Sequence, residues 1–277
     1  REDLPILLIG LDDQPAIDRM FAIESCRSGP TVADALRAGS LTGAIRLGNY
    51  GVHYVPTSPR IGELKREISD PDRLRRILAA ADWRGLVLLD TKSDLEILSQ
   101  NALRACDLAL VLARDLGSVE EAAKVFELLR LWGRPRDTAR VLLSQVDLRV
   151  KYAGGGARDI LSLLLEEIRR LEFPLLGTFV SSSPKVESLQ TNPDRVTQSI
   201  LHGAPSSLVH RQMQHLTDEV LAILWPDSGT EAAAPAPEAA AAEAPVHALG
   251  IDAAAWLDPV HAGIPAAEAA PRAQGAG

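Results

Sequence analysis

Short apolar runs alternate with longer stretches of helical periodicity along most of the chain. The runs are rich in Val, Ile and Leu, and they span residues 6–11, 52–56, 86–90, 108–113, 141–146 and 175–180. Helical patterns lie between or after them, over residues 31–38, 71–81, 93–105, 118–132, 157–171 and 206–224. Such alternation is typical of crossover units around a parallel sheet that is buried on both faces. It predicts an α/β fold with a doubly wound, mostly parallel sheet.

Two local signals support the predicted helix starts. Ser118, with Glu121 three residues later, predicts a capping box that opens the helix at residue 119. Asp70 followed by Pro71 predicts a proline at a first helical position. We read Asp94 as an acid in the first turn of the helix that follows it.

Composition changes after Pro226. Ala, Pro and Glu dominate residues 227–277, a composition that buries too little apolar surface to fold, so we predict a disordered Ala/Pro-rich C-terminal tail. Seven acidic residues and Arg272 give the tail a net charge of −6, which leaves −2 for a predicted domain over residues 1–226. Residues 246–260 would allow a short amphipathic helix on contact with a partner protein, although a chance apolar patch explains them equally.

Charge and cysteine content exclude several classes of protein. The chain has 29 Lys and Arg against 37 Asp and Glu, a formal net charge of −8, which argues against coating nucleic acid with the whole surface. Cys26 and Cys106 have no nearby Cys or His partner, so we expect neither a disulfide framework nor a zinc site, and a cytoplasmic setting fits. The apolar runs are shorter than the roughly 18 residues that a membrane span requires, so we expect no membrane attachment.

Acidic and polar residues follow two of the predicted strands. The run at 6–11 leads into Asp12, Asp13 and Gln14, and the run at 86–89 leads into Asp90 and Thr91. Ligands of open parallel sheets bind beyond the carboxyl ends of the strands, where carboxylates can hold magnesium and a polar group can orient an attacking water. An Asp after a strand is also a common turn residue or helix N-cap, so this reading stays open here.

Six segments match, in order, the motifs of one protein family. They are residues 8–14 (LIGLDDQ), 28–36 (SGPTVADAL), 51–59 (GVHYVPTSP), 86–91 (LVLLDT), 101–111 (NALRACDLALV) and 142–147 (LLSQVD). The corresponding family patterns are L-I-D-L-D-P-Q, a glycine followed by "ladvL", "gldlvPss", "vliDtpp", "NALraaDlvlvp" and "vlNmvd". The chain therefore resembles the ParA/MinD group of P-loop ATPases, whose members position plasmids, chromosomes, division sites or other cargo.

The resemblance implies roles for individual residues. Asp12 would stand in switch I, in contact with magnesium and the region of the nucleophilic water, and Gln14 would lie in the same switch as a catalytic residue. Asp90 would support the magnesium shell, so Asp12 and Asp90 are the implied metal ligands. The nucleotide would be bound by Asp90, Thr91, Ser144 and Gln145. The implied cofactors are ATP and Mg²⁺, and the implied reaction is ATP hydrolysis.

The family's phosphate-binding loop, K-G-G-x-G-K-[ST], would lie some tens of residues before Arg1. Residues 154–156 are three glycines, but no lysine and hydroxyl residue follow them, so we interpret them as a flexible loop. Without the phosphate loop, we expect this chain neither to bind ATP tightly nor to hydrolyse it. We also expect it to expose part of its sheet where the first strand belongs.

Four positions depart from the family patterns. Lys92 and Ser93 stand where prolines are common, Gly10 replaces an acid, and Ser144 replaces an asparagine that would read the adenine. Two functions follow. The first is a ParA-like ATPase that acts in plasmid or chromosome partition or cargo positioning by ATP-dependent dimerisation; the alternative is a degenerate, non-hydrolysing scaffold or partner-binding module.

The resemblance also implies partners. Family members commonly form homodimers around two ATP molecules, and many bind DNA non-specifically through basic residues. The candidates here are Arg149, Lys151, Arg158, Arg169, Arg170, Lys185 and Arg195. A solvated charged face explains any one of them as well, because nearby glutamates dilute the positive potential.

Overall fold

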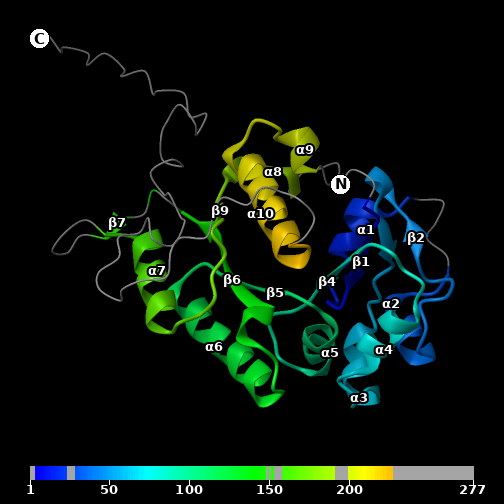
Figure 1. The fold of residues 1–277 in the computed structure, drawn as a ribbon. Coiled ribbons are helices and arrows are strands. Elements are labelled where there is room, and N and C mark those ends of the chain that lie inside the picture. Colours follow the sequence, from blue (N-terminus) through cyan, green and yellow to red (C-terminus); the bar gives the residue numbers. More distant parts are fainter. Residues whose placement is uncertain are drawn as a thin grey trace, which may run out of the picture. The chain divides into compact units, whose positions relative to one another are not determined.

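The computed structural model describes residues 4–23, 29–147, 149, 151–152, 158–190 and 199–226, whose elements are shown in Figure 1. The chain divides into two compact units. Unit 1 comprises Arg1–Leu110, Lys124–Ala139 and Glu187–Ser199, and unit 2 comprises Val111–Ala123, Arg140–Val186 and Ile200–Gly277. The predicted tail and Cys26 lie outside the described residues.

In its described part, unit 1 contains a four-stranded sheet of order β2-β3-β1-β4. The central strand, β1 (Ile6–Gly10), runs parallel to β3 (His53–Val55) on one side and to β4 (Leu86–Asp90) on the other. The short β2 (Arg46–Leu47) is antiparallel to β3. The mostly parallel sheet and its helices confirm the predicted α/β class, and β4 has the predicted bounds.

Helix α2 (Val32–Ala38) shows why the local sequence prediction succeeds where caps are present. The Thr31 side chain accepts a hydrogen bond from the Asp34 N–H, and the Asp34 carboxylate accepts one from the Thr31 N–H at 2.9 Å. Gly39, at φ 73°, ends the helix in the left-handed conformation that glycine adopts without strain. The other helical segments that lie mainly in unit 1 are α1 (Ala16–Phe21), η2 (Asn49–Gly51), η3 (Ile61–Glu63), α3 (Leu64–Glu67), α4 (Arg73–Ala80), α5 (Ile97–Ala105) and η4 (Arg136–Thr138).

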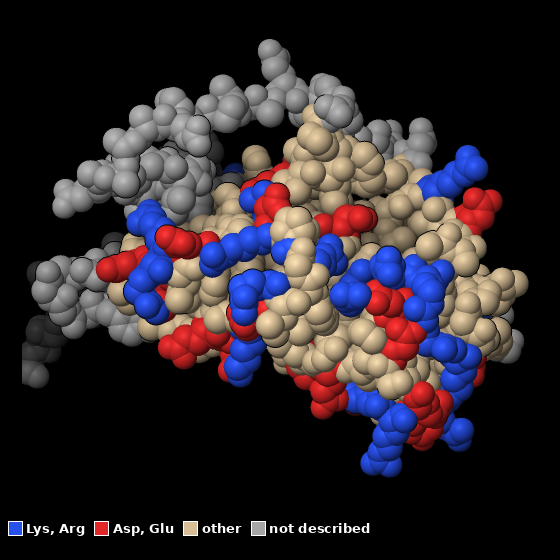
Figure 2. All heavy atoms as spheres, turned by 60° about the horizontal axis from the view of Figure 1, so that its bottom comes forward, with Lys and Arg blue, Asp and Glu red and all other residues tan. Residues whose placement is uncertain are grey.

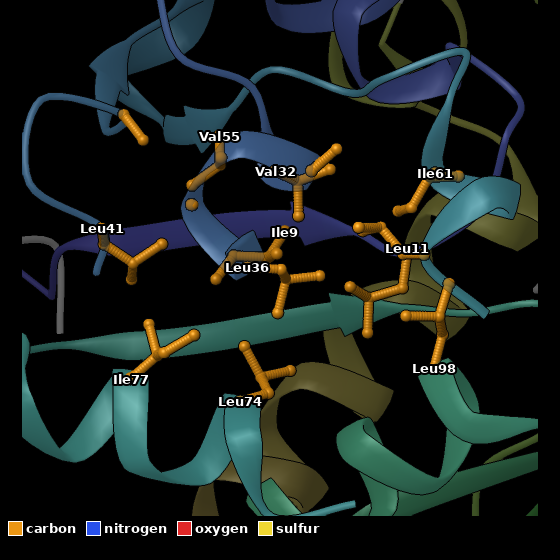
Figure 3. Packing of buried hydrophobic residues seen from close by; sticks show 14 of the residues in the cluster. Ile9, Leu11, Val32, Leu36, Leu41, Val55, Ile61, Leu74, Ile77 and Leu98 are labelled. Carbon is orange, nitrogen blue, oxygen red and sulfur yellow. The ribbon is translucent and has the colours of Figure 1, made fainter. Parts of the chain in front are cut away.

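Apolar side chains from β1 and three helices form the core of unit 1. Ile9 of β1, Leu36 of α2 and Leu74 of α4 are almost fully buried and belong to one cluster, which Figure 3 shows at close range. Leu98 of α5 and Val55 of β3 join it. Each such side chain contributes roughly 1.5–3 kcal/mol by leaving water. This packing fixes the position of β1 and therefore of the residues that follow its carboxyl end.

β4 is an edge strand in the part of the chain that the structure describes. It pairs with β1 from Ile6↔Leu86 to Gly10↔Asp90, and it stands last in the order of the sheet. Leu88, in the middle of β4, is 44% exposed. Among the described residues, β4 therefore has no strand paired on its other side.

Unit 2 contains most of a second, three-stranded sheet, of order β5-β6-β9 within the described residues. Its strands are β5 (Ala109–Ala113), which begins in unit 1, β6 (Ala139–Val146) and β9 (Val180–Ser181). The predicted run at 175–180 is only partly a strand, because Leu175 forms a single parallel bridge to Val141 before β9 begins. The remaining elements are α6 (Leu116–Leu131), β7 (Lys151–Tyr152), β8 (Arg158–Asp159), α7 (Ile160–Arg170), α8 (Pro184–Gln190), α9 (Ile200–Gly203) and α10 (Leu208–Leu224).

Polar contacts fasten α10 to the segment that contains β9. The Gln212 Oε1 atom accepts hydrogen bonds from the N–H of Ser181 at 3.0 Å and from its hydroxyl at 2.9 Å. The Glu219 carboxylate accepts the N–H groups of Gly177 and Thr178 at 2.6 and 2.9 Å. Gln212 and Glu219 are seven residues apart, so both lie on the same face of α10.

Three predicted helix starts need correction. The capping pair of α6 is Asp115 with Ser118, whose N–H donates to the Asp115 carboxylate at 2.8 Å while its hydroxyl oxygen accepts the Asp115 N–H at 3.0 Å. Pro71 lies before α4, which begins at Arg73. Asp94 lies before α5 rather than in its first turn, because α5 begins at Ile97.

Candidate functional site

The carboxyl ends of β1 and β4 meet at one edge of the unit 1 sheet. Gly10 is opposite Asp90 in the register, and the N–H of Leu11 donates to the carbonyl oxygen of Asp90 at 2.7 Å. Asp12 comes next along the chain, so the sheet brings the predicted pair Asp12 and Asp90 to neighbouring strand ends. Thr91 follows directly and is half-buried.

The Asp90 carboxyl group lies in an environment that disfavours its negative charge. Desolvation raises its pKa above the usual value, and the nearby Asp12 carboxylate raises it further. No hydrogen bond or ion pair to the Asp90 carboxylate is found within the described residues. Repulsion between two neighbouring carboxylates is relieved when a cation binds between them.

A compact turn follows Asp12. The Asp12 carboxylate accepts the N–H of Gln14 at 3.2 Å, and the Gln14 side-chain amide donates to the Asp13 carboxylate at 3.5 Å. Gln14 is exposed. The predicted catalytic pair, Asp12 and Gln14, therefore shares one turn directly after β1.

Lys92 reaches across from the end of β4 to this turn. Its ammonium nitrogen lies 2.7 Å from Asp13 Oδ2 and 3.6 Å from Asp12 Oδ1. The hydrogen bond from Lys92 is the largest of the effects that hold the pKa of Asp13 below its usual value. From the sequence, Lys92 was only a departure from a proline position and had no predicted role. Its position two residues after the strand-end Asp90 could have indicated that it lies near the site.

Thr57, just after β3, and Asp18 of α1 form a further contact near this edge, and neither was among the predicted site residues. The Asp18 carboxylate, from α1, accepts hydrogen bonds from the N–H of Thr57 at 3.0 Å and from the Thr57 hydroxyl. A Cβ on Gly10 would lie 3.0 Å from Ile17 Cδ1 and 3.1 Å from Thr57 Cγ2. A side chain at position 10, where the family pattern has an acid, would therefore require Ile17 and Thr57 to shift by a few tenths of an ångström.

The other two predicted nucleotide-binding residues lie in unit 2. Ser144 and Gln145 are near the carboxyl end of β6, at a register shift between the pairs Ser144↔Val180 and Val146↔Ser181. Gln145 is exposed and has φ 57°, a left-handed conformation that is uncommon for a residue other than glycine. Strained backbone of this kind often accompanies binding sites.

Comparison with solved structures identifies the fold. A putative plasmid partition protein from Borrelia burgdorferi B31, bound to AMPPNP, matches with a TM-score of 0.62 at 14% identity, over 79% of this chain and 87% of that chain. A ParA family ATPase from Chlorobium tepidum TLS matches with a TM-score of 0.58 at 13% identity, over 79% and 86% of the two chains. The chain has the fold of the ParA-type partition proteins.

The same fold occurs in an enzyme with another task. Cobyrinic acid a,c-diamide synthase from Mycobacterium smegmatis, with a bound ATP analogue and magnesium, matches with a TM-score of 0.54 at 16% identity, over 72% of this chain and 87% of that chain. No protein-family model and no curated protein sequence matches the chain. The ParA-type fold is therefore established by structure alone.

The strand ends of this ParA-type fold suit magnesium held partly by water. Among the described residues there is no group of three or more His, Cys, Asp or Glu side chains that could enclose a metal ion. Magnesium in nucleotide sites is commonly held by one or two carboxylates, with waters and phosphate oxygens as its other ligands. Asp12 and Asp90, two neighbouring carboxylates at a sheet edge, fit that requirement.

Local ion pairs neutralise some of the basic residues considered for DNA binding. Arg149 pairs with Asp147 at 2.8 Å, and Arg170 pairs with Glu167. Figure 2 shows basic and acidic side chains intermixed on the visible face, without a broad patch of one sign. Arg195, the side chains of Lys151 and Arg158, and the glycines at 154–156 lie outside the description.

Two further observations help to locate the candidate site and to exclude other features. No helix in the described ranges is long and apolar enough to cross a membrane. A hollow of about 390 Å³ opens elsewhere in unit 1, and its lining includes Leu41, Ile77 and Trp83. It contains none of the predicted site residues, so the strand ends remain the candidate site.

Proposed function

We propose that this chain is the body of a ParA-type ATPase that partitions plasmids or chromosomes, or positions another intracellular cargo, through ATP-dependent dimerisation. The observation that carries the proposal is the meeting of Asp12 and Asp90 at neighbouring strand ends in a fold shared with partition proteins. Residues 1–226 would form the nucleotide-hydrolase domain and would act in the cytoplasm.

The site residues would divide the work according to their chemistry. Asp12 and Asp90 would hold Mg²⁺, which when bound neutralises charge on the nucleotide phosphates. Gln14 carries a side-chain amide in the same turn as Asp12, where it could orient water for attack. Thr91 would add a hydroxyl beside the phosphates. Ser144 and Gln145 would bind the nucleotide, and Ser144 stands where the family has an asparagine that would read the adenine.

The open edge of β4 suggests how the phosphate-binding loop would be supplied. An unpaired parallel edge can accept one more strand, which would satisfy its backbone groups and cover Leu88. We propose that the strand that carries a phosphate loop in the ParA-type fold would pair at this edge. Such a strand would deliver the loop to the carboxyl edge where Asp90 ends β4.

The test compares this 277-residue chain with a longer form that includes the phosphate loop. We expect the longer form to hydrolyse ATP and to dimerise with ATP but not with ADP, as measured by light scattering after gel filtration. The chain alone should do neither, because it lacks the cradle for the phosphates. Micromolar ATP affinity of the chain alone, measured by calorimetry, would contradict this division of labour.

The Lys92 ion pair favours a second function, a non-hydrolysing scaffold that keeps the fold. An ammonium held between Asp12 and Asp13 takes up charge that a metal ion would otherwise neutralise. A scaffold of this kind would dimerise without nucleotide and show no hydrolysis even when the phosphate loop is present. Recruitment of a partner protein by the tail is compatible with either function.

DNA binding by the dimer is a further part of the proposal. Arg169 is an exposed candidate on α7, directly before Arg170. Arg169→Ala should weaken binding of non-specific duplex DNA and reduce its salt dependence, measured by fluorescence anisotropy. Arg170→Ala is the matched control, because Arg170 is already paired with Glu167.

A further inference from the structure

Lys92 forms the contact that links the turn after β1 to the segment after β4. Its ammonium lies closest to Asp13, at 2.7 Å, and also within 3.6 Å of Asp12. The side chain is 35% exposed, so water reaches the pair without surrounding it. Lys65, the neighbouring lysine, is engaged elsewhere, with Asp94 at 3.0 Å and with Glu96.

This contact is not needed to hold the two strands together. β1 and β4 pair along their whole length, and the N–H of Leu11 extends the hydrogen bonding beyond Gly10 to Asp90. The Lys92 pair also joins side chains that are about 80 residues apart, so it does not stabilise a helix or local turn. Its main effect is to offset the negative charge of Asp12 and Asp13.

A divalent cation at Asp12 would compete with Lys92 for the same carboxylate. Oδ1 of Asp12 lies within reach of the ammonium, and a metal bound there would repel it. A lysine side chain has several rotatable bonds and leaves an exposed pair at small cost, because such pairs contribute little free energy. Displacement is therefore cheap enough to accompany metal binding.

We propose that Lys92 is the resident counter-ion of Asp12 and Asp13 and that it lowers the affinity of the site for divalent cations until it is displaced. The inference rests on the proposed function in one respect, the use of Asp12 as a metal ligand. It makes Lys92 a positioning residue that offsets part of the negative charge of the turn before metal and nucleotide arrive.

The experiment titrates Mn²⁺ alone, without nucleotide, into the 277-residue chain at low ionic strength. Electron paramagnetic resonance of the free ion reports binding. Lys92→Met should bind Mn²⁺ about fivefold more tightly than the unchanged chain, the equivalent of a 1 kcal/mol ion pair. Lys92→Arg should restore the lower affinity, and Lys65→Met should change it far less. Circular dichroism melting would verify that each variant is folded.

Several outcomes would overturn the inference. They are equal affinities for the chain and Lys92→Met, an equal gain in Lys65→Met, and no Mn²⁺ binding by any variant. The double variant Asp12→Asn with Lys92→Met should lose the gain. If the gain persists there, the ion is not at Asp12 and the inference fails. If Mn²⁺ behaves as expected but the longer protein does not bind ATP, the proposed function fails and the inference stands.

Discussion

In unit 1, β1 and β4 lead into acidic side chains at the candidate site, whereas β9 in unit 2 ends in a buried hydroxyl group. Asp12 and Asp90 stand at an edge that includes exposed residues, and the Lys92 ammonium lies 3.6 Å from Asp12 Oδ1. Ser181, at the end of β9, is buried and hydrogen-bonded to Gln212 of α10. Because a charge is costlier to bury than a hydrogen-bonded hydroxyl, helix α10 can cover the polar end of β9. The edge at Asp12 and Asp90 in unit 1, which is exposed in part and charged, is therefore the one suited to bind an ion.

The largest expected effect tests whether the charged edge governs catalysis. In the complete protein, Asp12→Ala should lower kcat for ATP hydrolysis by about 100-fold or more, because it removes charge stabilisation of the transition state. Ser144→Ala should raise KM about threefold with kcat unchanged, since it touches only binding. Steady-state hydrolysis assays measure kcat and KM separately. Equal losses of kcat in Asp12→Ala and Ser144→Ala would mean that residues of the two units do not differ in role. Asp90→Ala should behave like Asp12→Ala, and unchanged hydrolysis in both would refute the site.

The second-largest expected effect concerns the free energy of unfolding, which depends on the apolar core of unit 1. Leu36→Ala should lower the free energy of unfolding by about 3 kcal/mol, because it leaves a cavity between β1, α2 and α4. Urea denaturation measures this loss. Leu47→Ala is the control, since Leu47 is 54% exposed and its removal should cost little. Similar losses in both variants would mean that burial does not set the stability of this unit.

Unit 2 should be sensitive to a polar contact instead. Glu219→Gln replaces a carboxylate that accepts two backbone N–H groups, and it should lower the free energy of unfolding by about 1–2 kcal/mol. The same denaturation assay applies. Gln214→Ala, on the exposed side of α10, should leave stability unchanged, and an equal loss there would point to helix propensity rather than to the contact.

The smallest expected effect is on the pH dependence of Tm. It can be tested on one ion pair from each unit. Arg104 in unit 1 holds the pKa of Asp72 at about 2, and Arg149 in unit 2 does the same for Asp147. A depressed carboxyl pKa stabilises the fold above pH 4, and this contribution is lost as pH falls from about 4 to 2. Arg104→Met should therefore lower Tm at pH 7 and have a smaller effect near pH 2, where much of the Asp72 carboxyl is already protonated.

The paired control for that experiment is Arg149→Met. Asp147 and Arg149 are two residues apart, so their pair can also form in the unfolded chain and contributes less to folding. Its Tm at pH 7 should match that of the unchanged protein. A loss as large as that of Arg104→Met would show that sequence separation does not matter here.

Much of the fold follows from local sequence. β4 has its predicted bounds because an uninterrupted apolar run leads directly into a strand-end Asp, and α2 ends as predicted because Thr31, Asp34 and Gly39 supply both caps. The start of α5 was misjudged because the Asp94 side chain binds Lys65 and Ser99 instead of opening the helix. Such side-chain choices depend on residues brought near by folding.

The site was predictable only in part for the same reason. A strand-end position identified Asp12 and Asp90, because parallel strands gather their carboxyl ends at one edge. The contact of Lys92 with Asp13 depends on the register of β1 against β4, which the sequence does not reveal. The left-handed conformation of Gln145 depends on a shift in strand register and carries no residue signal.

The turn after β1 has a mechanical consequence. It is anchored on one side by the Leu11 N–H, bonded to Asp90, and on the other by Asp18, bonded to Thr57. Any rearrangement of Asp12 is therefore confined to the few residues between these anchors. Motion of so short a tether belongs to the nanosecond-to-microsecond range of loops, faster than the collective movement of whole domains. The anchored turn can thus rearrange when a ligand binds without a collective movement of the whole domain.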